Sequence, residues 1–260
     1  FITKQELQTQ EQELRQTVEF ALNFAKKAGA EAEVGVTKVA GLSVSSRLEQ
    51  VENIEFNNDG SLGISVYLGK HKGNASTSDL QPQSIQRAVE SALAIAKYTS
   101  EDDCAGLADK ELMAFDAPDL ELYHQADLSV DQALALAIEA ENAALNADEQ
   151  IVNSEGATFN SHSGVRVYGN THGMLQSTLS SRYSLSCSVI AAHGEQLERD
   201  YEYTISREFD KLQAPQWVGQ QAAFKAVDRL NPQKIKTCEV PVIYYNDVAT
   251  GLIGHLAGAI

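Results

Sequence analysis

The chain has few cysteines and no long apolar run. Cys104, Cys187 and Cys238 are widely spaced and form no C-x-x-C pair, which argues against a disulfide framework and against a thiolate zinc site. We therefore expect all three to be ordinary small buried side chains. No apolar stretch approaches the roughly 18 to 20 residues that span a bilayer, and the first residues lack the basic-then-apolar pattern of a signal peptide. A cytoplasmic protein without membrane contact is expected.

Basic residues are also scarce. The sequence has 20 Lys and Arg against 36 Asp and Glu, which gives a formal net charge of -16 at pH 7. Such a surface repels a phosphate backbone, so we expect no direct contact with nucleic acid. The 260 residues, of which 43% are hydrophobic, are enough for one large domain or two small ones.

The first expected helix has a complete start signal. Thr3 and Glu6 form a capping-box pattern, and Ile2 can pack on Leu7 as a hydrophobic staple. Apolar residues then recur at helical spacing until Gly29, a residue type that commonly ends helices in the left-handed conformation. We therefore predict a helix that begins after Thr3 and ends before Gly29.

After this helix, strands and helices follow in two rounds. Apolar residues with a period of two predict several strands, with turns at Asn57–Gly60 and Gly69–Gly73 between antiparallel neighbours. A helix and an irregular polar crossing over residues 98–127 come next. A second capping-box pair, Ser129 and Gln132, then starts another round of helix, strands and helix.

Runs of consecutive strands between helices indicate an α+β fold with mainly antiparallel sheet, because a parallel sheet would alternate single strands with helices. We expect two successive units of helix, multi-strand sheet and helix, over residues 1–128 and 129–238. A strand at Val240–Tyr245 and a following helix would begin a C-terminal domain at residues 239–260. The apolar end of the sequence indicates that the protein continues beyond Ile260.

One predicted strand alternates charged and aromatic residues. The charged positions are Glu198, Arg199, Asp200 and Glu202, and the aromatic positions are Tyr201 and Tyr203. The pattern is typical of a solvated polar face, with a local ion pair worth under about 1 kcal/mol, opposite an aromatic face. An alternative remains open, in which the carboxylates bind a peptide amine or orient a partner.

The histidines do not form an obvious metal site. His162 and His172 are expected at the two ends of one strand of about eight residues, roughly 25 Å apart, which is too far for a shared metal ion. Three others, His71, His124 and His193, fall in turns or in the polar crossing. We therefore expect no catalytic or cofactor-binding residue among them.

Five segments, in this order and over practically the whole chain, resemble the TldD/PmbA metallopeptidase family, and within it the TldE-type subunit. The segments are Glu49–Asn57, Gly156–Ser161, Ser163–Asn170, Leu197–Thr204 and Asn246–His255. No single segment is specific, but their order and spacing together are.

The resemblance also implies what this chain lacks. TldD-type members carry H-E-x-x-x-H on a helix, and aligning Gly251 and Leu252 puts His255 at the first His, Leu256 at the Glu and Ile260 at the second His. Leucine cannot take a proton from water, and isoleucine has no lone pair for a metal. His255 is therefore the only remnant of the motif, and zinc is expected in a TldD-like partner.

The resemblance implies a cytoplasmic heteromeric peptidase that acts on unfolded or modified peptides, in peptide maturation and degradation. In such an assembly this chain would help to enclose a peptide-binding cavity, with edge strands suited to an extended peptide. Two alternatives stay open: a non-catalytic regulator or adaptor of the gyrase-modulator type, and a self-sufficient peptidase whose atypical metal site is completed after Ile260. A homodimer in the absence of the partner also stays open.

Overall fold

The computed structural model describes residues 3–259, so the expectations for Ile2 and Ile260 lie outside the described residues. The chain divides into two compact units, Phe1–Leu230 and Asn231–Ile260. Each unit is described by itself below. In residues 3–259, no helix is long and apolar enough to cross a membrane.

The first unit contains all of the strands that the structure describes. Its main elements are α1 (Lys4–Lys27), β1 (Glu31–Arg47), β2 (Gln50–Leu68), β3 (His71–Thr77), α2 (Pro82–Ala96), α3 (Val130–Leu145), β4 (Ile151–Asn170), β5 (Leu175–His193), β6 (Gln196–Ser206) and α4 (Pro215–Asp228). Two short 3-10 turns, at Lys110–Leu112 and Phe209–Lys211, lie between them. The predicted crossing is otherwise irregular.

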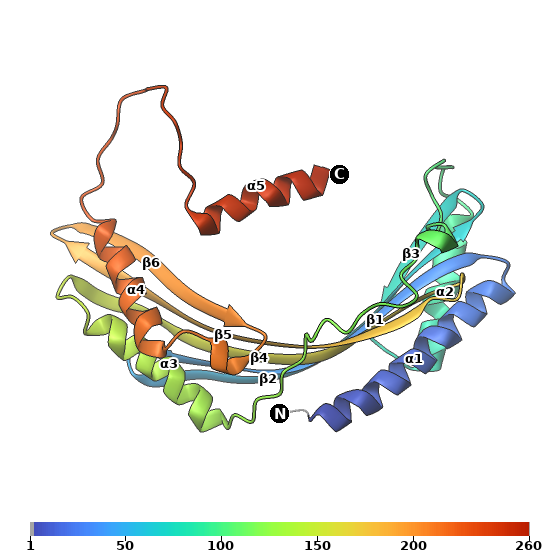
Figure 1. Ribbon diagram of the computed structural model, residues 1–260, viewed down its shortest axis with the longest axis horizontal. Coiled ribbons are helices and arrows are strands. Elements are labelled where there is room, and N and C mark those ends of the chain that lie inside the picture. Colours follow the sequence, from blue (N-terminus) through green and yellow to red (C-terminus); the bar gives the residue numbers. More distant parts are fainter. Residues whose placement is uncertain (1–2, 260) are drawn as a thin grey trace. The chain divides into compact units, whose positions relative to one another are not determined.

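All six strands form one antiparallel sheet in the order β3-β2-β1-β4-β5-β6. The predicted α+β fold is thereby confirmed. The strands of the two predicted helix, sheet and helix repeats join in one continuous sheet within the first unit. Figure 1 shows the sheet bent, with α1 and α3 on the outer side of the bend. We call the helix-covered side the outer face and the opposite side the inner face.

The two halves of the sheet repeat one motif. β2 and β5 each have 19 residues, and β1 and β4 lie side by side at the centre of the sheet. This arrangement places a local twofold axis between β1 and β4. α1 and α2 pack on the end of the sheet where β3 lies, and α3 and α4 on the end where β6 lies, while α1 and α3 each contact both β1 and β4. The outer face therefore has two hydrophobic clusters instead of one.

Local sequence signals set the helix ends as predicted. The Thr3–Glu6 and Ser129–Gln132 capping boxes both form, with each cap side chain accepting from the third backbone N–H of its helix. Gly29 has φ +77°, the left-handed conformation expected after a helix. These signals act within four residues, so they do not depend on the rest of the fold.

The turn predicted at Asn57–Gly60 is wrong, because β2 runs without interruption from Gln50 to Leu68. These turn-forming residues instead pair with β1 from Lys38 to Gly41. Cross-strand pairing over a long register outweighs the local turn preference of Asn and Gly. The consequence is one long strand whose polar middle pairs with the middle of β1.

The turn between β1 and β2 lies before Gln50, and a buried carboxylate stabilises it. Leu48 and Glu49, with φ +51° and +64°, join β1 to β2. Glu141 of α3 is fully buried and accepts hydrogen bonds from the Ser46 hydroxyl at 3.0 Å and from the N–H groups of Leu48 at 2.7 Å and Glu49 at 3.2 Å. The helix therefore fixes the end of the β1–β2 hairpin.

The second unit contains one helix, α5 (Asn246–Ala259). The predicted helix is therefore present. The predicted strand at Val240–Tyr245 is wrong, because these residues form no strand in the described part of the chain. An isolated extended segment has no ladder to pair with, and its hydrogen bonds cannot stabilise it alone.

The expectation of three buried cysteines is right only for Cys187, since Cys104 and Cys238 are exposed. Burial, followed by the nearby charge of Glu141, raises the pKa of the Cys187 thiol to about 12. At pH 8 its thiolate fraction is then about one part in ten thousand.

We predict that Ellman's reagent modifies Cys104 and Cys238 rapidly in the native protein at pH 8, and Cys187 only after unfolding. The reason is that the reagent needs both access and a thiolate. In a Cys187→Ala control, the native reaction should be unchanged, and the additional thiol that reacts after unfolding should be absent. Rapid native-state reaction of all three thiols would contradict the burial of Cys187.

Candidate functional site at the inner face of the sheet

The helix at the position of the family's zinc motif, α5, carries one histidine among its described residues. His255 lies on α5, directly before Leu256. Within residues 3–259, no three His, Cys, Asp or Glu side chains lie close enough together to hold a metal ion. One imidazole beside a leucine does not match the three protein ligands of a catalytic zinc site, so the described residues do not fit the metal.

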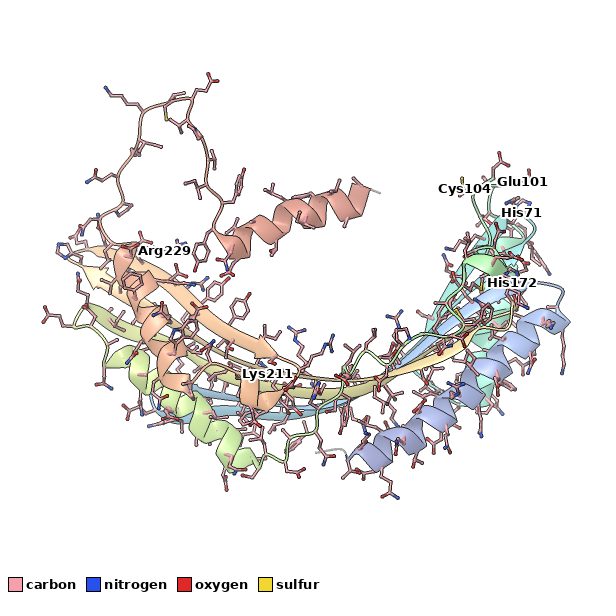
Figure 2. The ribbon with its side chains drawn as sticks, in the orientation of Figure 1. His71, Glu101, Cys104, His172, Lys211 and Arg229 are labelled. Carbon is pink, nitrogen blue, oxygen red and sulfur yellow. The ribbon has the colours of Figure 1, made fainter. Side chains whose placement is uncertain are left out.

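Most of the other histidines lie apart from one another and next to polar partners. His71 contacts Glu101 at 3.6 Å and His172 contacts Glu31 at 3.0 Å, both at the β3 end of the sheet (Figure 2). His124 lies 3.8 Å from Glu208. His193 contacts Gln150 at 3.4 Å, at the turn between β5 and β6. These are local surface pairs.

His162 differs from the prediction. It lies in the middle of β4 and not at a strand end, because β4 continues for 20 residues from Ile151 to Asn170. Its cross-strand neighbours are Gly41 on β1 and Arg182 on β5. His172 follows the end of β4, so the predicted position of His172 is right and that of His162 is wrong.

The inner face that holds His162 is rich in hydroxyl groups. The register of β1, β4 and β5 assigns to it Thr37, Ser43, Ser45, Thr158, Ser180, Ser184 and Ser186. By contrast, the outer-face positions of the same strands are mostly apolar and include the buried Val, Leu, Ala and Phe side chains of the core. Within the first unit, one face of the sheet therefore forms the core and the other is polar.

A row of four residues crosses the centre of the inner face. Asn57, Gly41, His162 and Arg182 pair in this order across β2, β1, β4 and β5. Gly41 leaves the space that its neighbours fill: a Cβ at this position would lie 2.5 Å from Nδ1 of His162 and 2.7 Å from Oδ1 of Asn57. We call these four residues the central row.

The central row combines a neutral base, a cation and an unused acceptor. Burial, followed by the charge of Arg182, lowers the pKa of His162 below its ordinary value of 6.5. Oδ1 of Asn57 is buried and has no hydrogen-bond partner among the described residues. Asn57 and Arg182 are three strand spacings apart, roughly 14 Å, so a ligand would have to span several strands, as an extended peptide does, to donate to Asn57 and accept from Arg182.

The lowered pKa of His162 predicts a pH dependence. Between the unfolded-state pKa of about 6.5 and the lower folded value, the unfolded chain binds more protons, so the free energy of unfolding falls as the pH falls through this window. The contribution of His162 is fully present above about pH 6.5. Ring titration by NMR, with His162→Gln to assign the signal, checks this directly.

Arg182→Gln is the matched variant, since it removes the neighbouring charge and retains the burial. The pKa of His162 should then rise part of the way toward its ordinary value. A His162 ring that titrates at or above pH 6.5 in the unmodified protein would contradict the proposed environment.

β6 presents its two faces in the opposite way to the prediction. Tyr201 and Tyr203 are exposed on the inner face and stack with ring centroids 6.4 Å apart. Glu202 is buried toward α4, where Lys225 lies 2.9 Å from it. The expected solvated carboxylate face is therefore wrong, because α4 supplies the cations that make burial of the carboxylates tolerable.

Two of the three remaining charges of this strand are also paired. Asp200 binds Arg229 at the end of α4, and Arg199 binds Glu155 of β4 at 3.0 Å. Asp200 and Glu202 are thus held by cations of the protein itself, which argues against an amine-binding pair formed by these two carboxylates. The sequence alternation located the strand but not which of its faces is covered.

Two family models match the sequence: the PmbA/TldA metallopeptidase domain 1 over residues 32–96, and the PmbA/TldA metallopeptidase central domain over residues 123–230. A metalloprotease PmbA homolog of Haemophilus influenzae is 71% identical over 254 residues, which cover 98% of this chain and 56% of that protein. The metalloprotease PmbA of Escherichia coli O157:H7 is 54% identical over 255 residues, covering 98% of this chain and 57% of that protein. The chain therefore spans a little over half the length of these curated relatives.

Solved structures share the fold at low sequence identity. A protein of Bacteroides thetaiotaomicron, described as a proposed modulator of DNA gyrase, matches with a TM-score of 0.77 and 23% identity, over 91% of this chain and 52% of that one. TldE from Thermococcus kodakarensis matches with a TM-score of 0.62 and 16% identity, over 81% and 47%. These similarities support the architecture described above.

Proposed function

This chain belongs to the PmbA/TldD metallopeptidase family, and from that premise we propose that it is part of the TldE-type subunit of a two-subunit peptidase. In this proposal a TldD-like partner holds the zinc ion, and the assembly cleaves unfolded or modified peptides in the cytoplasm. The observation that carries the proposal is the sequence His255-Leu256 on α5, where the zinc-binding motif would need a glutamate.

The inner face supports a role in holding the peptide. An unfolded peptide offers the same donor and acceptor groups along its backbone whatever its sequence. A hydroxyl-rich surface, with an unused acceptor at Asn57 and a donor at Arg182, can bind such a backbone without selecting side chains. We therefore assign peptide binding to the inner face and hydrolysis to the partner.

The test uses the full-length protein and the TldD-like subunit of the same organism. Zinc content and cleavage of an unstructured reporter peptide are measured for each subunit alone and for their mixture. We expect stoichiometric zinc in the TldD-like subunit, and cleavage that needs the mixture. Stoichiometric zinc and full cleavage by this protein alone would overturn the division of roles.

A His255→Ala variant separates the proposal from a self-sufficient peptidase. If His255 were a ligand of an atypical metal site, its replacement would remove the metal from the full-length protein. We expect the variant to leave the zinc content and the activity of the mixture unchanged. Loss of both would favour the self-sufficient enzyme.

A further inference from the structure

The sheet has several edge stretches, and in most of them other groups of the protein already bind some of the backbone N–H or carbonyl groups. On β6, the N–H groups of Tyr201 and Tyr203 donate to the side chains of Asp200 at 2.7 Å and Glu202 at 2.9 Å. On β3, the carbonyl of Lys72 accepts from the Thr99 hydroxyl at 3.0 Å. These contacts use backbone groups that could otherwise pair with another strand.

The first half of β5 is closed by the crossing segment. β6 pairs only with residues 183–193 of β5. Beyond that point the carbonyl of Leu122 accepts from the N–H of Ser181 at 2.9 Å, and the carbonyl of Phe115 accepts from the side chain of Gln176. The chain between α2 and α3 thus runs beside this stretch of β5.

The equivalent stretch of β2 is open. β3 pairs only with Leu62–Leu68, so residues 51–61 have β1 on one side and no further strand in the described chain. The stretch is nevertheless held in place, because Glu141 fixes the adjacent Leu48–Glu49 turn. It is an ordered edge without a neighbour, the type of edge to which another strand can be added.

The open edge carries apolar side chains on the outer face. Val51, Ile54 and Phe56 lie opposite Ser46, Val44 and Leu42 of β1, which are all outer-face positions. Phe56 is 70% exposed, and Val51 and Ile54 are also exposed. An apolar stripe of this kind on an unpaired edge is unusual for a surface that stays in water.

A small cavity adjoins the stripe. Its volume is about 200 Å³, and its walls include Phe56, Leu42 and Ser161. Ser161 is 2% exposed, and its buried hydroxyl has no hydrogen-bond partner among the described residues. A side chain that enters from the outer face would cover the apolar walls and could satisfy this hydroxyl.

The charge of the open β2 edge indicates which kind of partner binds there. Glu49, Glu52, Glu55 and Asp59 lie along this stretch, so a second copy of the chain would bring two acidic edges together, which is unfavourable. We propose that residues 51–61 of β2 add a strand of the TldD-like partner subunit, one with apolar side chains on the outer face and with Lys or Arg opposite the acidic positions. This inference rests on the proposed function and identifies the surface that joins the two subunits.

The test compares edge variants of the full-length protein in their affinity for the TldD-like subunit. Ile54→Lys and Phe56→Lys should each weaken the complex about tenfold or more, because they bring charge into a buried apolar contact. Tyr201→Lys, at an exposed aromatic residue on the closed β6 edge, is the matched control and should change affinity less than about twofold. Unchanged thermal unfolding of each variant excludes a folding defect.

Hydrogen exchange gives a second readout, since amides of residues 51–61 should become protected in the complex if a strand is added there. Equal affinity of all variants without new protection would overturn this inference and leave the two-subunit proposal intact. Absence of any complex with the unmodified protein would overturn both.

Two further outcomes would show that the open edge binds something other than the TldD-like subunit. If the protein alone forms dimers that Phe56→Lys abolishes, the edge joins two copies of this chain. If assembly is normal but the variants raise KM for the peptide, the edge binds substrate. Either result contradicts the assignment to the partner subunit.

Discussion

Glu141→Ala is expected to lower the free energy of unfolding by about 3 kcal/mol, because it removes one carboxylate that accepts three hydrogen bonds. The Ser46 hydroxyl is fully buried and would lose its acceptor. The N–H groups of Leu48 and Glu49 lie in an exposed turn, so water can replace part of their hydrogen bonding. Urea unfolding, followed by circular dichroism, measures the change.

Two controls on the same helix sharpen the result. Glu139→Ala removes an exposed carboxylate from α3, and its effect should stay within about 0.5 kcal/mol. Glu141→Gln retains one acceptor oxygen but places an amide donor beside the donors of the turn, so an intermediate loss is expected. If Glu141→Ala matched Glu139→Ala, the hairpin would not depend on the buried contact.

The buried glutamate could have been recognised in the sequence, but its role could not. Ala133, Ala137, Ala140 and Ala144 form the buried stripe of α3, and Glu141 lies four positions after Ala137 on that stripe. A carboxylate at such a position must find donors when it is buried. The donors are about ninety residues away along the chain, so spacing alone does not identify them.

The strands show the same division between local and long-range information. The capping boxes of α1 and α3 were predictable because each needs only four neighbouring residues. The turn at Asn57–Gly60 was predicted from residue type, but pairing with β1 keeps these residues extended. Which face of β6 is buried depends on α4, which no pattern within β6 specifies.

The central row is the clearest example of a site set by register. Asn57, Gly41, His162 and Arg182 belong to four different strands and become neighbours only when three ladders are aligned. Each of the four residues has an ordinary local explanation when it is taken alone. The sequence predicted the sheet that carries the row, and the register that assembles it follows from long-range pairing.

Gly41→Ala tests the packing of this row, and we expect it to cost about 2 kcal/mol of unfolding free energy. The added Cβ would contact the backbone carbonyl oxygen of Ser161 as well as the side chains of His162 and Asn57. Because one of these atoms belongs to the backbone of the central strand β4, side-chain rotation alone cannot relieve the contact. Urea unfolding of the variant measures the loss.

Gly35→Ala is the matched control, since Gly35 lies on the same face of the same strand and a Cβ there would meet no atom within 4 Å. Alanine restricts the unfolded chain more than glycine does, so this variant should gain roughly 0.5 to 1 kcal/mol. The two substitutions therefore differ in the sign of their effect, although the chemical change is identical. Equal effects at both positions would show that the space above Gly41 is not occupied by His162 and Asn57, and the central row would then lose its physical basis.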